Sequence, residues 1–334
     1  MRAYRLTSSP GGFRLDLRHE TAPQPGPGQA VIRVRAVSLN YRDLVMRKGQ
    51  YGSAAENKIP CSDGAGDIVA VGDGVTRVRV GDRVAGIFMQ RWISGPPTLD
   101  AHRSALGGDL DGMLAEQVVL NEQGLVKLPD YLSFEEGATL PCAAVTAWHA
   151  LVERGNLQAG QTVLVLGTGG VSMFAAQIAT AMGASVIATS GSPDKIARLR
   201  EMGFGSTINY KETPDWDKSV RSMTGSRGVD HIVEVGGNTI EKSLKAVAVG
   251  GHIAQIGVVA GRDLGMNPFS LVLKNIMMNG IYVGSRDHFE KMNAFFAANQ
   301  IRPVISDHFG FEDADDAFGC LEAARHFGKI VIRV

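Results

Sequence analysis

The stretch QTVLVLGTGGVSMFAAQIATAMGASVIATS (161–190) decides the fold of this chain. It opens with an apolar run at 161–167, which is typical of a buried strand. A helical segment at 170–182 and a second apolar strand at 184–190 follow. A strand, a crossover helix and a strand in this order lie in one sheet with the two strands parallel. The stretch therefore predicts an α/β fold built around a parallel sheet.

Glycines stand where the first strand meets the helix. Gly167 permits the tight turn, and Gly169 lets the backbone approach a pyrophosphate. Ser172 takes the third position, where a small side chain lets helix and sheet pack closely. Gly170 and Val171 would then present backbone N–H groups at the positive end of the helix dipole. This order of strand, glycines and helix predicts a dinucleotide site, and a purely structural glycine turn is the alternative.

The end of the second strand indicates which dinucleotide is bound. An NAD site usually carries an acidic residue there, which holds the 2′-hydroxyl of the ribose. Ser190 stands at this position instead, and Ser192 and Lys195 offer a hydroxyl and a positive charge to a 2′-phosphate. The sequence therefore favours NADP(H), with NAD(H) as the second choice. In the alternative interpretation, Ser192 and Pro193 only cap the next helix and Lys195 is a solvated charge.

The rest of the chain divides into two parts. Strands predicted at 206–210, 228–236, 252–258 and 276–284, with helices at 193–203 and 239–250, continue the alternation. The N-terminal part is β-rich, with strands predicted at 30–39, 65–72, 75–87 and 114–120. We therefore expect a dinucleotide-binding domain over 126–286, and a β-rich domain over 1–125 to which 287–334 returns.

The composition is that of an ordinary globular protein. The 334 residues carry 34 Lys and Arg against 34 Asp and Glu, so the formal charge is zero and nothing in it attracts nucleic acid or a membrane surface. Cys61, Cys142 and Cys320 lack the spacing of a disulfide framework or a zinc ribbon. The first residues lack the apolar segment of a signal peptide. We expect a cytoplasmic protein without nucleic-acid or membrane partners.

Several motifs together resemble the medium-chain dehydrogenase/reductase superfamily, within it the zinc-free quinone oxidoreductase branch. They are SLNYRD (38–43), IPCSDGAGDIVAVG (59–72), VGDRV (80–84), LPCAAVTAWHAL (140–151), GTGGVS (167–172) and NY (209–210). The resemblance spans nearly the whole chain. It implies a GroES-like, β-rich catalytic domain and a doubly wound Rossmann domain, with the active site in the cleft between them.

The resemblance also locates three positions that hold catalytic zinc in the alcohol dehydrogenases. Here they are Asn40, Ser62 and Cys142, in place of Cys, His and Cys. A catalytic zinc needs about three protein ligands, so we expect no zinc. The four cysteines of the family's structural zinc lobe are missing from 88–112 as well. Cys142 is then a small buried hydrophobe, or a contact to the nicotinamide end.

Without a metal, hydride transfer to a quinone or an α,β-unsaturated carbonyl is easier than alcohol oxidation, because the developing negative charge is delocalised. Asn40 and Tyr51 are the candidate hydrogen-bond donors for that charge, by resemblance to the family pattern. Alternatively Asn40 caps a helix and Tyr51 lines a wall. Asp43 and Arg47 are spaced for an ion pair within a helix.

Other expectations concern neighbouring charges, the loop 88–112 and the histidines. Asp63 is expected to pair with Arg42 or Arg47. The loop is long and rich in glycine and proline, so Arg91 and Trp92 are candidates for substrate contact. The histidines show no paired ligand spacing, and none is assigned to catalysis.

The remaining cofactor contacts are implied by the resemblance alone. They are Thr146, Tyr210, Gly236, Ile256, Gly257, Val258, Val283 and, at the pyrophosphate, Lys329. The apolar segment IMMNGIYVG (276–284) would form a sheet edge, which family members pair across a two-fold axis, so a homodimer is expected.

Two other functions stay open. One is an alcohol or aldehyde dehydrogenase that uses NAD(H), for which the metal ligands and the acidic ribose residue are missing. The other is a cofactor-binding paralogue without turnover.

Overall fold

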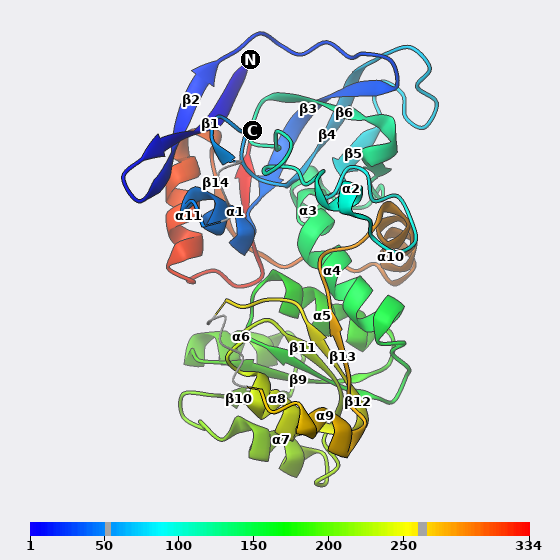
Figure 1. Ribbon diagram of the computed structural model, residues 1–334, viewed down its shortest axis with the longest axis vertical. Helices are drawn as coiled ribbons and strands as arrows, with labels where there is room; N and C mark the ends of the chain where they lie inside the picture. Colours follow the sequence, from blue (N-terminus) through cyan, green and yellow to red (C-terminus); the bar gives the residue numbers. More distant parts are fainter. Residues whose placement is uncertain (51–54, 260–265) are drawn as a thin grey trace. The chain divides into compact units, whose positions relative to one another are not determined.

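The computed structural model describes residues 1–50, 55–259 and 266–334. The chain forms two compact units. Unit 1 contains Met1–Val145 and Val283–Val334, and unit 2 contains Thr146–Tyr282. Figure 1 shows both, coloured along the sequence. The predicted GroES-like and Rossmann architectures correspond to unit 1 and unit 2.

Unit 2 is built on a six-stranded parallel sheet with the order β10-β9-β8-β11-β12-β13. Its strands are β8 (Thr162–Leu166), β9 (Ser185–Ser190), β10 (Ser206–Asn209), β11 (Val229–Glu234), β12 (Val247–Gln255) and β13 (Met277–Gly280). The helices are α5 (Gly170–Ala181), α6 (Pro193–Glu201), α7 (Trp216–Met223), α8 (Ile240–Ala246) and α9 (Phe269–Lys274). In Figure 1, α5 lies on one side of the sheet and α7 and α8 on the other. The strand order reverses at β8, and ligands of such sheets bind at the carboxyl ends of the strands beside this reversal.

Unit 1 contains a β1–β2 hairpin and a mixed sheet with the order β14-β15-β3-β4-β5-β7, in which β6 also pairs with β3. The strands are β1 (Arg2–Ser9), β2 (Gly12–His19), β3 (Gln29–Ser38), β4 (Asp63–Val71), β5 (Arg83–Gly86), β6 (Gln117–Asn121), β7 (Leu125–Lys127), β14 (Ile305–Phe309) and β15 (Lys329–Arg333). The helices are α1 (Tyr41–Arg47), α2 (Leu99–His102), α3 (Phe134–Ala138), α10 (Arg286–Asn299) and α11 (Ala314–Glu322). Because β15 runs antiparallel to β3, the C-terminal strand begins beside the end of β3, with Val331 opposite Ser38.

The unit boundaries differ from those that the sequence suggested. Unit 1 extends to Val145 rather than to residue 125, because α3 packs on β3, β4 and β5. Ser133 caps α3 through a capping box with Glu136. The π-helical segment Leu140–Ala144, α4 (Val145–Trp148) and a second π-helical segment, His149–Arg154, carry the chain onward. The return to unit 1 begins at Val283 rather than at residue 287.

Several predicted elements are wrong in extent, and the strand expected at 276–284, for example, covers only Met277–Gly280. Of the strand expected at 75–87, only Arg83–Gly86 is extended. The backbone N–H groups of Thr76 and Arg77 instead donate to the carboxylate of Glu122, each at 2.7 Å, so they need no strand partner. The helix expected at 239–250 ends at Ala246, because Val247 begins β12 and pairs with β11.

Each unit has its own hydrophobic core. Fully buried side chains in unit 1 include Leu6, Ile32, Ile68, Leu106 and Phe318, and those in unit 2 include Leu164, Ile232, Ile240 and Ile253. Across the described residues, no helix combines the length and the apolar character that a membrane span requires.

Candidate functional site

The glycine turn of unit 2 has the geometry of a dinucleotide site. Gly167 has φ +76°, a left-handed conformation that favours glycine. Gly169 is the N-cap of α5, and a Cβ added there would meet no atom of the described chain within 4 Å. The protein's own packing therefore does not require this glycine, whereas a close ligand would. Ser172 is buried and donates to the carbonyl oxygen of Leu166 at 2.7 Å, which ties the start of α5 to the end of β8. Gly170 and Val171 form the first turn of α5.

The end of β9 presents hydroxyl groups and an aromatic wall. Ser190 is 3% exposed, and its hydroxyl oxygen accepts the N–H of Ser192 at 3.3 Å. Ser192 caps α6 by accepting the N–H of Lys195 at 3.4 Å, so the capping interpretation is confirmed. The backbone of Tyr210 donates to the carbonyl oxygen of Ser190, and a Cβ at Gly191 would come within 2.7 Å of the Tyr210 ring. Serine hydroxyls and a tyrosine ring lie at this strand end.

Glu234 organises the adjacent strand ends and was missed by the sequence analysis. Its buried carboxylate accepts hydrogen bonds from the backbone of Gly236 at 2.9 Å and from the hydroxyls of Thr239 and Ser243. Its carbonyl oxygen accepts the N–H of Ile256 at 2.8 Å. Glu234 therefore fixes the predicted cofactor residues Gly236, Ile256 and Gly257 at the carboxyl edge of the sheet, and Val258 follows them, 41% exposed. A carboxylate at a strand end before paired glycines was the available signal.

Thr146 and Val283 lie where the chain passes from one unit to the other. Thr146 is 2% exposed in α4. Val283 is 4% exposed and has φ +55°, which is unusual for a β-branched residue and is typical of a strained functional position. By contacts Thr146 belongs to unit 2 and Val283 to unit 1.

Unit 1 contains a buried polar cluster around Asn40, which we call the Asn40 cluster: Asn40, Ser62, Asp63, Cys142 and Lys329. Asn40 follows β3 and is the N-cap of α1, with its N–H donated to Asp43 Oδ2 at 2.8 Å, so the predicted cap is confirmed. Lys329, the first residue of β15, is 3% exposed and donates from Nζ to Oδ1 of Asn40 and to the carbonyl oxygen of Leu39, each at 2.6 Å.

The other side of the cluster is formed by the residues before and within β4. Nδ2 of Asn40 lies 3.5 Å from Oγ of Ser62, and Ser62 donates to Oδ1 of Asp63 at 2.7 Å. The second oxygen of Asp63 accepts the N–H of Cys142 at 3.0 Å. Burial raises the pKa of the Asp63 carboxyl, and the nearby Lys329 opposes this shift. The three positions that the family resemblance singled out, 40, 62 and 142, therefore meet in one place.

The backbone before Ser62 is held in an uncommon conformation. Cys61 has φ +69° and is completely buried. Gly107 and Gly112 press against its backbone, where an added Cβ would come within 2.8 and 2.2 Å. These close approaches fix the turn that directs Ser62 and Asp63 toward Asn40.

The charged residues next to the cluster pair differently from the predictions. Arg47 binds Asp315 at 2.6 Å, so the predicted Asp43–Arg47 pair is wrong. Asp43 is turned inward to the N–H of Asn40 and lies 3.9 Å from Arg42. Burial raises the pKa of Asp43 to about 6. For Asp63 the structure gives Ser62 and the backbone of Cys142 as partners, in place of Arg42 or Arg47.

The donor set of the cluster does not fit a catalytic zinc. Asn40 presents a neutral amide whose oxygen already accepts from an ammonium, and Ser62 presents a neutral hydroxyl. The thiol of Cys142 has a pKa raised by burial and by Asp63, which disfavours the thiolate that zinc binds. Within residues 1–50, 55–259 and 266–334, no group of three or more His, Cys, Asp or Glu side chains is placed to hold a metal.

The remaining site predictions have mixed outcomes. Tyr51 lies outside the described residues. Trp92 is 3% exposed and donates to the carbonyl oxygen of Gly95, while Arg91 binds Asp100 at 2.7 Å, so both serve the packing of the loop 88–112. Their contact with a substrate stays a prediction.

The histidines are less scattered than their sequence positions suggest. His231 and His252 lie on neighbouring strands, with their Nδ1 atoms 3.3 Å apart. Both are buried, and burial lowers both pKa values. Strand pairing across 21 residues of sequence creates this pair, which no local spacing reveals.

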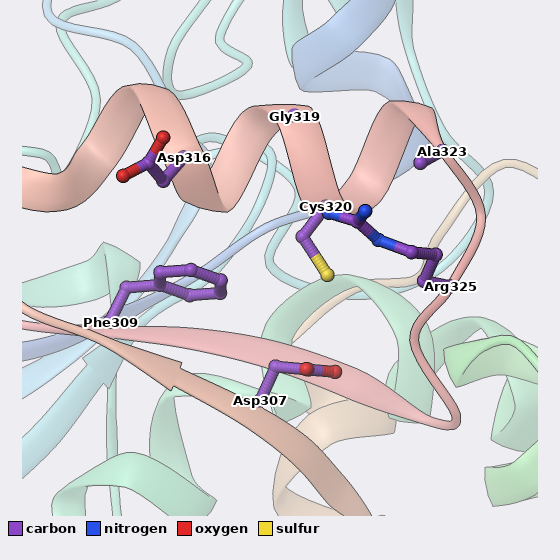
Figure 2. Close-up of a pocket in the computed structure, with 7 residues that line it drawn as sticks. All are labelled: Asp307, Phe309, Asp316, Gly319, Cys320, Ala323 and Arg325. Atoms are coloured by element: carbon purple, nitrogen blue, oxygen red, sulfur yellow. The ribbon is translucent and has the colours of Figure 1, made fainter.

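A hollow of about 680 Å³ lies beside β14 and α11 in unit 1, and Figure 2 shows the side chains that line it. It is lined by Asp307, Phe309, Asp316, Gly319, Cys320, Ala323 and Arg325, none of which belongs to the Asn40 cluster. Burial raises the pKa of the Cys320 thiol, so it is not an activated nucleophile. The hollow adds no group to the candidate site.

Two family models match the chain. One describes the alcohol dehydrogenase GroES-like domain and matches residues 26–130. The other describes the zinc-binding dehydrogenase domain and matches residues 170–298.

Individual proteins are similar over nearly the whole length. A zinc-type alcohol dehydrogenase-like protein of Schizosaccharomyces pombe is 41% identical, with 95% of this chain and 94% of that protein covered. An acryloyl-coenzyme A reductase of Metallosphaera sedula is 29% identical, with 95% and 96% covered.

Solved structures agree with this. A crystal structure from Sinorhizobium meliloti 1021, provisionally assigned as an alcohol dehydrogenase, has a TM-score of 0.93 at 40% identity and covers 100% of this chain and 98% of its own. The Pseudomonas syringae pv. Tomato DC3000 quinone oxidoreductase has a TM-score of 0.84 at 28% identity, with 100% and 99% covered.

Proposed function

The chain belongs to the medium-chain dehydrogenase/reductase superfamily, and from this premise we propose a zinc-independent, NADPH-dependent oxidoreductase that delivers hydride to a quinone or an α,β-unsaturated carbonyl. The superfamily makes it an oxidoreductase with a Rossmann-type nicotinamide dinucleotide site. The choice of NADPH, the zinc independence and the acceptor are the proposed parts.

The main support for this proposal is the chemistry of the side chains in the Asn40 cluster. Alcohol oxidation at neutral pH is helped by a Lewis acid that lowers the pKa of the alcohol, and Asn40, Ser62 and Cys142 are poorly suited to hold one. The amide of an asparagine and the hydroxyl of a tyrosine can instead donate hydrogen bonds to a developing enolate or quinol oxygen. Asn40 is the proposed catalytic donor, and Tyr51 stays the second predicted donor.

The acceptor class follows from the same chemistry. A conjugated carbonyl or quinone spreads the incoming charge onto its oxygen, so hydrogen bonds suffice to stabilise it. Two similar proteins bear names of this kind, a quinone oxidoreductase and an acryloyl-coenzyme A reductase, whose named substrate contains an α,β-unsaturated carbonyl.

NADPH is proposed because the end of β9 carries no carboxylate. Ser190, Ser192 and Tyr210 surround the strand end, and Lys195 lies in the first turn of α6. When bound, the dinucleotide supplies the hydride. The chain's part is to hold the pyrophosphate on Gly169, Gly170 and Val171 and the rest of the cofactor along the remaining predicted contacts, namely Thr146, Gly167, Gly236, Ile256, Gly257, Val258 and Val283.

A homodimer through β13 is also proposed. β13 ends the described sheet of unit 2, and Met277 on it is 48% exposed. The neighbouring helix α9 leaves Phe269, Val272 and Leu273 between 59% and 68% exposed. An apolar sheet edge of this kind is covered when a second copy pairs with it.

The function is tested by cofactor titration followed by turnover. NADPH and NADH are titrated by the quenching of tryptophan fluorescence. The preferred cofactor is then oxidised with 1,4-benzoquinone, 9,10-phenanthrenequinone and an enone, and zinc is quantified by mass spectrometry. We expect NADPH to bind about ten-fold more tightly or better, a difference of about 1.4 kcal/mol, and turnover to proceed without stoichiometric zinc. Tighter NADH binding with zinc-dependent alcohol oxidation would contradict the proposal, and binding without turnover would indicate a non-catalytic protein.

A further inference from the structure

The side-chain amide of Asn40 is held from both ends. Nζ of Lys329 lies 2.6 Å from Oδ1, and Oγ of Ser62 lies 3.5 Å from Nδ2. Lys329 and Ser62 are both buried, and Asn40 is 9% exposed. The amide therefore sits inside a constrained polar site, where an unsatisfied contact is costly.

The chemistry of the two neighbours permits one orientation of this amide. An ammonium has only donors, so the Asn40 atom that faces Lys329 must be the oxygen. Ser62 gives its hydroxyl proton to Asp63 and therefore faces Asn40 with a lone pair, which calls for a donor. The hydrogen bonds thus run in one direction, from the ammonium of Lys329 through Asn40 and Ser62 to the carboxylate of Asp63.

We propose that Lys329 is a positioning residue that fixes the orientation of the Asn40 amide, and thereby makes Nδ2 the hydrogen-bond donor that this site offers to a substrate oxygen. The proposal rests on the proposed function for the identity of the reaction. Nδ2 carries two hydrogens, and the contact with Ser62 uses one of them. A cation on Oδ1 also polarises the amide, which strengthens Nδ2 as a donor.

The role of Asn40 in the reaction follows. For an enone, hydride adds to the β-carbon, the C=C electron pair moves to the bond between the α-carbon and the carbonyl carbon, and the C=O pair moves onto oxygen. Nδ2 of Asn40 stabilises that enolate oxygen by a hydrogen bond. A proton from water then reaches the α-carbon, which completes the reduction. Lys329 touches none of the reacting atoms in this scheme.

This assignment replaces the predicted contact between Lys329 and the pyrophosphate. Two of the three ammonium hydrogens are donated within unit 1, to Leu39 and Asn40, and the residue is almost completely buried. A pyrophosphate contact would make Lys329 necessary for cofactor affinity, whereas a residue that only positions Asn40 would not. Cofactor titration of a Lys329 variant therefore distinguishes the two roles.

The first test compares K329M, K329R and K274M with the wild type. Lys274 is a matched control in unit 2, because its Nζ also donates to backbone carbonyls, those of Leu244, Lys245 and Val247, but contacts no member of the Asn40 cluster. The measurements are the NADPH Kd, the KM of the acceptor, and kcat per NADPH-binding site, which corrects for misfolded protein. For K329M we expect kcat to fall about ten-fold or more with an unchanged Kd. K329R, which keeps a donor-only cation, should retain much more of kcat than K329M, and K274M should resemble the wild type.

Other outcomes overturn the assignment. A ten-fold weaker NADPH affinity with normal kcat would make Lys329 a cofactor contact. A normal kcat per site with a lower melting temperature would make it purely structural. If K329M does not fold, K329Q, whose side chain keeps polar atoms, takes its place in the same comparison.

The second test needs no turnover. The protein is labelled with ¹⁵N at asparagine side chains and its NMR spectrum is recorded. The Nδ2 signals of Asn40 are identified as those that are lost in N40D. We expect these signals to shift in K329M and to stay in place in K274M; signals unmoved by K329M would refute the proposal. If the wild type reduces neither quinones nor enones, the proposed function fails, and this measurement still decides whether Lys329 orients Asn40.

Discussion

The candidate sites of the two units consist of different chemical groups. In unit 2 the glycine turn offers backbone N–H groups, and all of its residues come from the single segment 166–172. In unit 1 the Asn40 cluster consists mainly of side chains, and the bond between Lys329 and Asn40 joins residues 289 positions apart. The backbone site depends on chain conformation, whereas the cluster depends on the identity of each side chain.

This difference explains how one fold accommodates different chemistry. The glycine turn and the parallel sheet of unit 2 have the form of a Rossmann-type domain. In unit 1 the positions that the family resemblance assigns to catalytic zinc are occupied by Asn40, Ser62 and Cys142, while the fold is that of the superfamily. Function is therefore expected to change most sharply with single substitutions in unit 1, and cofactor affinity with substitutions in unit 2.

The largest effect is expected from Asn40→Asp. The carboxylate still accepts from Lys329 but has no hydrogen to donate, so kcat should fall about 100-fold or more while NADPH affinity stays the same. The measurements are steady-state kinetics and fluorescence titration. Asn299→Asp is the control, since the exposed Asn299 also donates from Nδ2, to the carbonyl oxygen of Phe295. A normal kcat in N40D would reduce Asn40 to the cap of α1.

Gly169→Asp should act on the cofactor alone. It adds bulk and a negative charge where the pyrophosphate is expected, and NADPH affinity should fall about 100-fold, which is about 2.8 kcal/mol at about 1.4 kcal/mol per factor of ten. Gly205→Asp is a matched control, because a Cβ at this exposed glycine likewise meets no atom within 4 Å. Equal affinities in the two variants, measured by titration, would show that α5 holds no pyrophosphate.

Ser190→Asp tests the preference between cofactors. A carboxylate at the end of β9 repels a 2′-phosphate and holds a 2′-hydroxyl, so the ratio of the NADPH and NADH Kd values should move about ten-fold toward NADH. Ser185→Asp places the same charge at the exposed start of the same strand and should leave the ratio unchanged. An unmoved ratio in S190D would contradict the proposed binding of the ribose.

The smallest effect concerns the His231–His252 pair of unit 2, which we expect to influence the stability of the protein. Burial, with a further contribution from His231, lowers the pKa of His252 to about 4 from its ordinary value of 6.5. Between these values the unfolded chain binds the proton and the folded chain does not. The free energy of unfolding should therefore decrease as pH falls from 6.5 toward 4, by at most about 1.4 kcal/mol per pH unit from this residue.

Urea unfolding between pH 7.5 and 5 measures this slope. His252→Gln should flatten it, whereas the control His19→Gln, at an exposed position, should not. An equal slope in wild type and H252Q would remove the His231–His252 pair as its cause.

Local sequence signals predicted unit 2 well, because they concern neighbouring residues. The glycine spacing and the βαβ order were both recovered in the structure. The errors arose where a distant residue intervened. Glu122 satisfies the N–H groups of Thr76 and Arg77, and the pairing of Val247 with β11 ends α8 early.

The sequence by itself determined the parallel sheet and the glycine turn, since each follows from residue types at fixed short spacings. That Asn40 and Ser62 stand at zinc-ligand positions is what the family resemblance implies. Only the tertiary structure decided that Lys329 and Asp63 join Asn40, that Glu234 organises the strand ends, and that His231 meets His252. The physical reason is that such contacts depend on strand pairing and chain crossing, which bring together groups that are distant in sequence. A buried charge can pair only with groups that the fold places within hydrogen-bonding distance.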